Sequence, residues 1–393
     1  MFSPFAGLLF DPTAVHSVGD ATSPPYDVID PGERTALAAR SQHNVVRLLL
    51  ADDDDPSYAA AGQLLAGWRR DGTLRLDPIP RFYLYRMDYF TPDGEPRTAR
   101  GILGALELVE LGDTVLPHEE TMAKHRADRL AVLTSTQANI DPIIALSPAP
   151  GLAGLIGEGD APRLDFTTPD GIRHRLSDVA DPERVAAIES SVAAHPVAIA
   201  DGHHRYTTAL GYRSSLEAAG AAGAGCRAIL AFLAPAYGSG LTVAPYHRVF
   251  ASFPFSPAAV ADAFAVSAGE ATVPHRPGDL VVVLGAGGPA TALSPRPEAL
   301  AQLPEPWREA GTAVARELLY PRIGVDEDQA EYVSNAAAAV AAAPAGGAAM
   351  LVSAVSESAI AAAGRMGIRF PQKSTYFVPK PRAGLVLRAL GTD

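Results

Sequence analysis

The sequence predicts a mixed α/β protein built in two parts. Of its 393 residues, 48% are hydrophobic, which is enough for a large buried core. Short apolar runs typical of strands alternate with longer segments that have helical periodicity. Beyond residue 250 the composition shifts toward Ala, Pro and Gly. We therefore expect a first part over residues 1–250 and a further α/β part over residues 251–393.

The elements of the first part can be placed in order. Helices are expected over residues 31–40, 58–71, 117–133 and 182–194, with a Pro near the start of the first and last. Strands are expected over residues 44–50, 81–90, 100–108, 140–146 and 197–200, with another near residue 229. A hairpin is expected around Thr168–Gly171.

The second part follows the same logic. Helices are expected over residues 257–264, 296–302, 308–318, 328–343 and 357–366, and strands over 350–353 and 370–380. The run Val281–Ala290 resembles a dinucleotide-binding fingerprint, but Pro289 interrupts the helix that such a site requires. Its glycines therefore favour a hairpin turn.

Composition excludes several function classes. The formal charge of −12 argues against an extended nucleic-acid surface, which needs clustered Lys and Arg. No apolar run is long enough to span a bilayer, and no signal peptide is recognisable. Cys226 stands alone, so it has no partner for an intramolecular disulfide. We expect a cytoplasmic protein that binds small molecules, not nucleic acid or membrane. The acidic run Asp52–Asp55 is expected to be a solvated loop, with a cation site as the alternative.

The strongest chemical signal is Asp201-Gly202-His203-His204-Arg205, at the point where an apolar strand leads into a helix. The first N–H groups of a helix have no intrahelical partner, so this position favours phosphate. Arg205 could grip a phosphate, Asp201 could hold a bridging cation, and His203 or His204 could donate or shuttle a proton. The alternative is structural: Asp201 caps the helix, Gly202 makes the turn and the histidines are partly buried.

Two further clusters carry charge. His118-Glu119-Glu120 begins a segment that continues with Lys124 and Arg129, and either glutamate could be a general base toward a substrate hydroxyl. A solvated helix face is the alternative for this segment.

The second cluster, Lys373-Ser374-Thr375-Tyr376 with Lys380, lies near the C-terminal end. It is either an edge strand with solvated lysines or a contact for an anionic ligand. We expect Lys373 and Ser374 to belong to the cofactor-binding set.

Together these segments resemble a known family. The residues concerned are Pro24–Ile29, Asn44–Leu48, His118–Thr121 with Lys124 and Arg129, Ala200–Leu210 and Pro371–Lys380. Nearly the whole chain resembles the bacterial domain-of-unknown-function family number 1015. Locally, Asp201–Arg205 is similar to the phosphate-binding motif of the ParB/sulfiredoxin superfamily, especially its free serine kinases.

This second resemblance implies a ParB/sulfiredoxin-like nucleotide-binding core. It further implies that Asp201–Arg205 bind nucleotide phosphates and Mg²⁺, and that Glu119 or Glu120 activates the substrate hydroxyl. The expected function is nucleotide-dependent phosphoryl transfer, from ATP or ADP, to a small hydroxyl-bearing metabolite such as free serine. Two alternatives stay open: a nucleotide- or metabolite-binding regulatory protein without turnover, and a metal-dependent hydrolase that uses His118, His203, His204 and Asp201.

Overall fold

The computed structural model describes residues 1–50, 58–91, 94–120, 126–157 and 161–391. The acidic run Asp52–Asp55 and the motif residues Thr121 and Lys124 lie outside these ranges. The chain forms two compact units: unit 1 comprises Met1–Leu116, Met122–Leu241 and Pro379–Asp393, and unit 2 comprises Pro117–Thr121 and Thr242–Val378. The sequence places the second part at residues 251–393, whereas unit 2 begins at Thr242 and the last residues return to unit 1. They return because Ala383 pairs with Ser23 and Leu387 pairs with Leu8.

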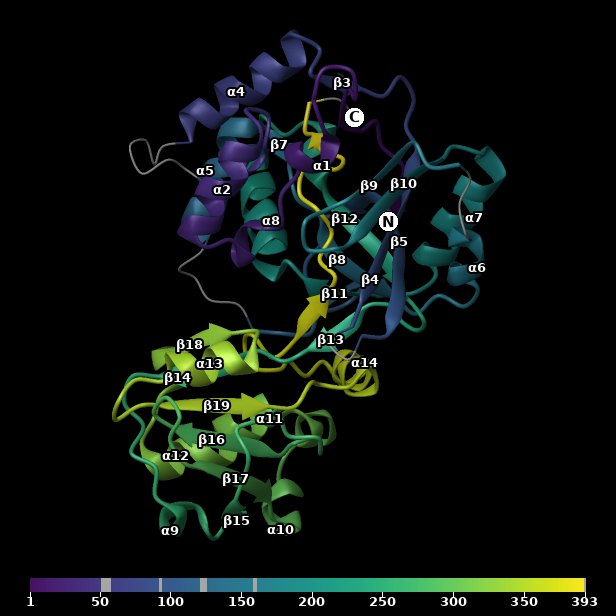
Figure 1. The fold of residues 1–393 in the computed structure, drawn as a ribbon. Coiled ribbons are helices and arrows are strands. Elements are labelled where there is room, and N and C mark those ends of the chain that lie inside the picture. The colour runs from purple at the N-terminus through teal and green to yellow at the C-terminus, as the bar shows by residue number, and fades with distance from the viewer. Residues whose placement is uncertain (51–57, 92–93, 121–125, 158–160, 392–393) are drawn as a thin grey trace. The chain divides into compact units, whose positions relative to one another are not determined.

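Unit 1 is built on a nine-stranded mixed sheet (Figure 1). The strand order is β6-β11-β8-β12-β5-β4-β10-β9, and β1 pairs with β5. In chain order the strands are β1 (Phe2–Ser3), β4 (Phe82–Phe90), β5 (Pro96–Glu107), β6 (Val115–Pro117), β8 (Ile143–Ser147), β9 (Leu164–Thr167), β10 (Arg173–Val179), β11 (Val197–Asp201) and β12 (Ala228–Pro235). Strand β12 is parallel to β8 and antiparallel to β5, which makes the sheet mixed. The predicted mixed α/β class is confirmed.

Helices and two small ribbons complete unit 1. The helices are α1 (Val18–Ala21), α2 (Pro31–Arg40), α3 (Val46–Leu49), α4 (Ala59–Arg70), α5 (Arg126–Thr136), α6 (Leu152–Ile156), α7 (Pro182–Ala193) and α8 (His203–Ala218). The ribbons pair β2 (Leu8–Phe10) with β3 (Leu74–Leu76) and β7 (Ala138–Asn139) with β21 (Arg388–Ala389). Local chemistry explains helix starts: Asp30 accepts from the Glu33 amide and Asp181 from the Arg184 amide, each directly before a Pro.

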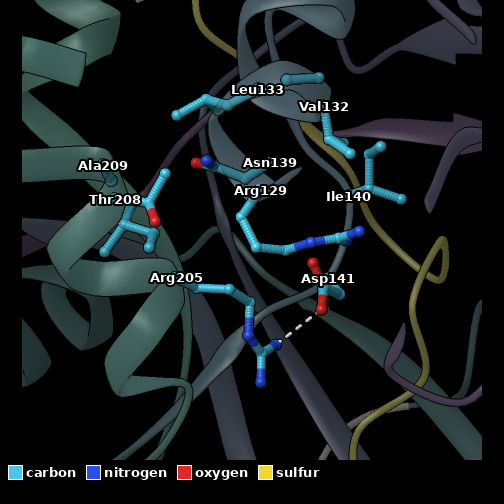
Figure 2. A pocket seen from close by; sticks show the side chains of 11 residues that line it. Arg129, Val132, Leu133, Asn139, Ile140, Asp141, Arg205, Thr208 and Ala209 are labelled. Carbon is cyan, nitrogen blue, oxygen red and sulfur yellow. Dashed lines mark hydrogen bonds and ion pairs between the residues drawn. The ribbon is translucent and has the colours of Figure 1, made fainter. Parts of the chain in front are cut away.

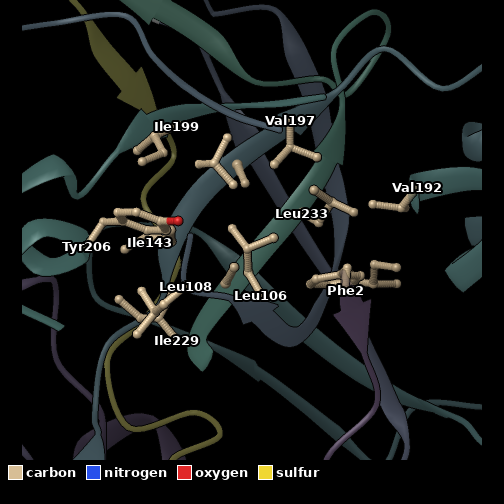
Figure 3. Close-up of a cluster of buried hydrophobic side chains, with 14 of the residues drawn as sticks. Phe2, Leu106, Leu108, Ile143, Val192, Val197, Ile199, Tyr206, Ile229 and Leu233 are labelled. Atoms are coloured by element: carbon tan, nitrogen blue, oxygen red, sulfur yellow. The ribbon is translucent and has the colours of Figure 1, made fainter. Parts of the chain in front are cut away.

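A large apolar cluster joins the sheet of unit 1 to α7 and α8 (Figure 3). Phe2, Ile143, Ile199 and Tyr206 are each fully buried in it. Tyr206 lies on the first turns of α8, and its hydroxyl donates to the carbonyl of Val109 at 2.9 Å. The start of α8 is therefore fixed to the sheet by packing and by a hydrogen bond.

Two sequence predictions in unit 1 are wrong. Residues 44–50 form a short helix, not a strand, because the Asn44 side chain accepts from the Val46 amide at 2.9 Å and donates to the carbonyls of Asp20 and Thr22. An apolar run buried all round does not distinguish strand from helix by periodicity. Of the predicted helix over 117–133, residues 126–133 lie in α5, whereas Glu119, which belongs to unit 2, forms a parallel bridge with Phe370.

Unit 2 contains a six-stranded antiparallel sheet with the order β15-β17-β16-β19-β14-β18. Its strands are β14 (His247–Phe250), β15 (Phe264–Ala268), β16 (Leu280–Leu284), β17 (Ala290–Pro295), β18 (Ala330–Val333) and β19 (Ala348–Val352), and β13 (Thr242–Ala244) pairs separately with β20 (Tyr376–Val378). Its α-helices are α9 (Pro257–Val260), α10 (Pro297–Leu300), α11 (Gly311–Val314), α12 (Tyr320–Ile323), α13 (Ala336–Ala342) and α14 (Glu357–Met366). A buried cluster that includes Phe250, Val282 and Met350 forms its core.

In unit 2 the hairpin prediction is confirmed, because β16 and β17 pair around positive-φ glycines at 285 and 287. The helix predicted over 328–343 is shorter: residues 330–333 form β18, and Asn335 caps α13 by accepting from the Ala338 amide. Only Tyr376–Val378 of the predicted strand 370–380 is extended in a sheet. Within the part of the chain that the structure describes, no helix has the length and apolar character needed to cross a membrane.

Candidate functional site

The strand-to-helix junction of unit 1 forms as predicted. Strand β11 changes register between Ile199 and Asp201, which is a bulge or similar irregularity at the last residues of the strand. Gly202 follows with a φ of +91°, and a Cβ there would lie 2.7 Å from Cγ2 of Ile143. This position requires glycine, because an L side chain would be both strained and in contact with β8.

Helix α8 begins directly after Gly202, which has no side chain of its own to cap the helix. The Asp201 carboxylate, one residue earlier, pairs with two cations, Arg205 and Lys380. His203 is buried and His204 is half-buried. The amide end of a 16-residue helix thus lies where the strand ends, which is the geometry that binds anions in many proteins.

Arg205 is committed to the interior of unit 1. Its Nη1 donates to Asp141 Oδ2 at 2.9 Å and to the carbonyl of Pro142 at 2.5 Å, and its Nη2 donates to Asp201 Oδ2 at 2.6 Å. Burial lowers the pKa of Arg205, but the carboxylates of Asp141 and Asp201 outweigh burial and hold the pKa above its usual range. The guanidinium therefore orients Asp201. Its Nη atoms already donate to protein oxygens, whereas the sequence predicts an Arg205 guanidinium that binds a phosphate.

Lys380 belongs to this site, although we did not include it in the predicted set. Its Nζ forms a short ion pair with Asp201 Oδ1 and lies 3.5 Å from Asp27 Oδ2. Burial lowers the pKa of Lys380, and the charges of Asp201 and Asp27 more than reverse that effect. Asp141, Arg205, Asp201, Lys380 and Asp27 thus form one alternating charge chain. The sequence offers two signals: Asp27 and Lys380 occur in segments that carry the family resemblance, and Lys380 accompanies the 373–376 cluster, which is either an edge strand or a contact for an anionic ligand.

Other segments that carry the family resemblance place residues beside this alternating charge chain. The ring of Tyr26 lies 3.9 Å from the Arg129 guanidinium carbon and 6.0 Å from that of Arg205. Arg129 also donates to the carbonyl of Leu49 at 2.8 Å. Burial raises the pKa of Tyr26 to about 12, so this phenol stays neutral. Segments more than a hundred residues apart therefore converge on α8.

A cavity of about 50 Å³ lies beside this arrangement (Figure 2). Its polar lining includes Arg129, Asn139, Asp141, Arg205 and Thr208. The Oγ1 of Thr208 and the Nε of Arg205 are both buried without a hydrogen-bond partner. The space is sufficient for ordered water, which needs at least roughly 10–15 Å³ and polar partners.

The residues predicted at 118–120 and 373–375 come together in unit 2. Glu119 Oε1 accepts from the amides of Ser374 at 3.1 Å and Thr375 at 2.8 Å, and from the Thr375 hydroxyl at 2.6 Å. Its Oε2 accepts from the Lys373 amide at 3.1 Å, and His118 Nε2 lies 2.7 Å from Thr375 Oγ1. Four donated hydrogen bonds hold this carboxylate, so Glu119 anchors the loop.

Backbone carbonyls of the same loop also accept hydrogen bonds from a buried side chain. Arg248 is fully buried and donates to the carbonyls of Gln372 at 3.0 Å and Lys373 at 3.1 Å. The Ser374 hydroxyl is also engaged, since it donates to the Pro371 carbonyl at 2.6 Å and lies 2.7 Å from Thr312 Oγ1. Lys373 takes a φ of +53° and places its Nζ 4.8 Å from the centre of the Tyr246 ring. The structure thus builds a rigid loop that presents Lys373, while Ser374 is part of the scaffold.

Glu120 differs from its neighbour. More than half of its side chain is exposed, and its Oε2 pairs with Arg316 Nη1 at 3.0 Å. Among the described residues, no three His, Cys, Asp or Glu side chains gather in a way that could hold a metal ion. Of the predicted hydrolase set, His118 belongs to unit 2, whereas Asp201, His203 and His204 belong to unit 1.

Comparison with known proteins places the chain in a family. A family model described as "Protein of unknown function (DUF1015)" matches residues 2–315. The chain belongs to the DUF1015 family. This confirms the family resemblance drawn from the motif segments. No curated protein matches the sequence.

Several solved structures are similar to this DUF1015 protein at low identity. SbnI from Staphylococcus aureus, with a C-terminal truncation, is 12% identical with a TM-score of 0.42, and the match covers 74% of this chain and 90% of that one. A free serine kinase mutant in complex with ADP is 14% identical with a TM-score of 0.38, covering 70% and 86%. A conserved hypothetical protein from Pyrococcus furiosus is 13% identical with a TM-score of 0.37, covering 74% and 97%. At these values the likeness is distant, and it assigns no ligand to this chain.

Proposed function

We propose that this protein binds a nucleotide by its phosphates at the start of α8 and transfers a phosphoryl group to a small hydroxyl-bearing metabolite. The observation that carries the proposal is the position of the amide end of α8, which begins at Gly202 where β11 ends, beside the charged side chains of Asp201 and Lys380. Backbone amides and a nearby ammonium group are the donors that phosphates favour. Free serine is the first metabolite to test, and ADP and ATP are the first nucleotides. The distantly similar free serine kinase structures are complexes of those proteins with ADP and with AMP.

The donor set at this end of α8 also fits Mg²⁺. Asp27 and Asp201 both bring a carboxylate oxygen to the same point, at Lys380 Nζ, and carboxylate oxygens are the ligands that Mg²⁺ prefers. When bound, Mg²⁺ would neutralise phosphate charge. The protein's own residues have three proposed roles. The amides of α8 orient the phosphates, and Arg205 holds Asp201 in place. The half-buried His204 imidazole, three residues after Asp201 in the sequence, moves a proton.

For the general base we propose Glu120. Glu119 is fixed by four hydrogen bonds, whereas the Glu120 carboxylate is more than half exposed and has Arg316 as its partner. Lys373, held at the tip of its anchored loop, is a candidate contact for an anionic group of the substrate.

The decisive experiment is a product assay. Pure protein is incubated with Mg²⁺, ADP or ATP, and serine or a metabolite pool, and new phosphorylated compounds are identified by mass spectrometry. Glu120→Gln should lower kcat at least about a hundredfold without changing nucleotide affinity. Glu317→Gln is the matched control, because Glu317 also pairs with Arg316 at 3.0 Å. Folded protein that yields no product with either nucleotide would refute phosphoryl transfer, and nucleotide binding without product would point to a sensing role.

A further inference from the structure

The C-terminal segment of unit 1 delivers a cation to the proposed phosphate site. Ala383 exchanges hydrogen bonds with Ser23, and the Gly384 amide donates to the Ile140 carbonyl at 2.9 Å. A Cβ at Gly384 would lie 2.5 Å from Cγ1 of Val45, so the segment is packed closely against the body of the unit. This anchoring sets Lys380 beside Asp201, a residue 179 positions away in the sequence.

The two cations of the alternating charge chain are not equivalent. Arg205 bridges Asp141 and Asp201 with a rigid planar fork, and Asp141 is buried, so moving the guanidinium would strand a carboxylate in the interior. Lys380 carries a compact charge on a flexible stem. Its partners, Asp201 and Asp27, keep 15% and 19% of their side-chain surface exposed. Lys380 is therefore the member that can exchange a partner.

The charge balance indicates what such an exchange requires. Arg129 lines the same cavity as Asp141 and Arg205 and pairs with Asp128, so four carboxylates, on Asp27, Asp128, Asp141 and Asp201, face three cations, on Arg129, Arg205 and Lys380. A polyphosphate that entered this chain alone would add negative charge to a group that already has a surplus carboxylate. A divalent cation on Asp27 and Asp201 would remove that repulsion and release the Lys380 ammonium group toward the phosphates.

We propose that Lys380 is a phosphate-contacting residue, held in reserve by Asp201 and Asp27 until a nucleotide and a divalent cation arrive together. This inference rests on the proposed nucleotide binding and deepens it. It adds a residue to the site and makes phosphate affinity depend on the cation. Adenosine, which has no phosphate, has no contact with Lys380 in this scheme.

Titration calorimetry with ADP and with adenosine tests the inference, each with MgCl₂ and with EDTA. We expect wild-type protein to bind ADP at least tenfold more tightly with Mg²⁺ than with EDTA. We expect Lys380→Met to weaken ADP binding at least tenfold while adenosine affinity stays unchanged. Arg173→Met is the control, because Arg173 forms an exposed ion pair with Asp165 in the same unit and should change neither affinity.

The outcomes separate the two proposals. Wild-type protein that binds neither ADP nor adenosine refutes nucleotide binding itself. Folded Lys380→Met that binds ADP like wild type, or that loses ADP and adenosine affinity equally, overturns the role of Lys380 and leaves the proposed function standing. Should Lys380→Met fail to fold, the Mg²⁺ dependence of the wild type decides, and equal ADP affinity in EDTA overturns the exchange.

Discussion

The charged clusters of the two units satisfy their carboxylates in opposite ways. In unit 1, Asp201 lies between two cationic side chains, Arg205 and Lys380. In unit 2, Glu119 is held by three backbone amides and a hydroxyl. Ionic partners can be exchanged for a charged ligand, whereas amides of a folded loop cannot leave without unfolding it. We therefore keep the proposed ligand binding for the first cluster and expect Glu119 to anchor its loop.

The largest effect is expected at Arg205. Arg205→Ala leaves Asp141 and Asp201 without their shared cation, and removal of one partner from a buried ion pair costs about 3–5 kcal/mol. Chemical denaturation followed by circular dichroism measures this loss. Arg173→Ala removes an exposed ion pair instead and should lower the denaturation midpoint far less than Arg205→Ala does. Equal losses in both variants would contradict the buried-network interpretation.

The neighbouring residues Glu119 and Glu120 of unit 2 are expected to contribute very differently to stability. Glu119→Ala deprives the amides of Lys373, Ser374 and Thr375 of their acceptor, and we expect a loss of about 2–4 kcal/mol in the free energy of unfolding. Glu120→Ala removes one exposed ion pair and should cost under about 1 kcal/mol. If the two variants unfold at the same denaturant concentration, Glu119 does not anchor the loop.

In each unit, burial lowers the pKa of a histidine: His174 in unit 1 and His247 in unit 2. Burial lowers the pKa of His174 in unit 1 to about 3 and that of His247 in unit 2 to about 4. Between these values and the usual pKa of about 6.5, the unfolded chain binds more protons than the folded one, so stability present above pH 6.5 is lost as the pH falls. We expect about 2 kcal/mol per histidine between pH 6.5 and pH 5.

Denaturation curves across that pH range test the histidine prediction. His174→Gln and His247→Gln should each reduce the acid-induced loss, because each removes one group that the unfolded chain protonates. A pH dependence that neither substitution changes would show that other groups control it.

The smallest effect is expected in the cavity beside α8. Thr208→Val keeps the shape of the side chain and removes a buried hydroxyl that has no hydrogen-bond partner. We expect the free energy of unfolding to rise by up to about 1 kcal/mol. A clear loss of stability would show instead that an ordered water in the cavity bonds to Thr208, and a high-resolution crystal structure would locate it.

Sequence reasoning was most accurate where the signal is local. The strand, glycine and helix at Val197–Ala218 follow from apolar patterning and from a backbone position that only glycine tolerates. It failed within residues 44–50, where a short apolar run predicts a strand but Val46–Leu49 form a helix, and at residues 117–120, where Glu119 pairs with Phe370. In both places distant contacts override local preference.

The sequence by itself determined the α/β class, the family and the junction at Asp201–Gly202, because periodicity and backbone sterics act over a few residues. Only the tertiary structure decided which charges meet. It placed Lys380 on Asp201, turned Arg205 inward to Asp141, and enclosed Glu119 in the amides of residues 373–375. These pairings join residues as far as 256 positions apart in the sequence. Coulomb and hydrogen-bond energies depend on the distance between atoms in space, and the order of residues in the sequence does not give that distance.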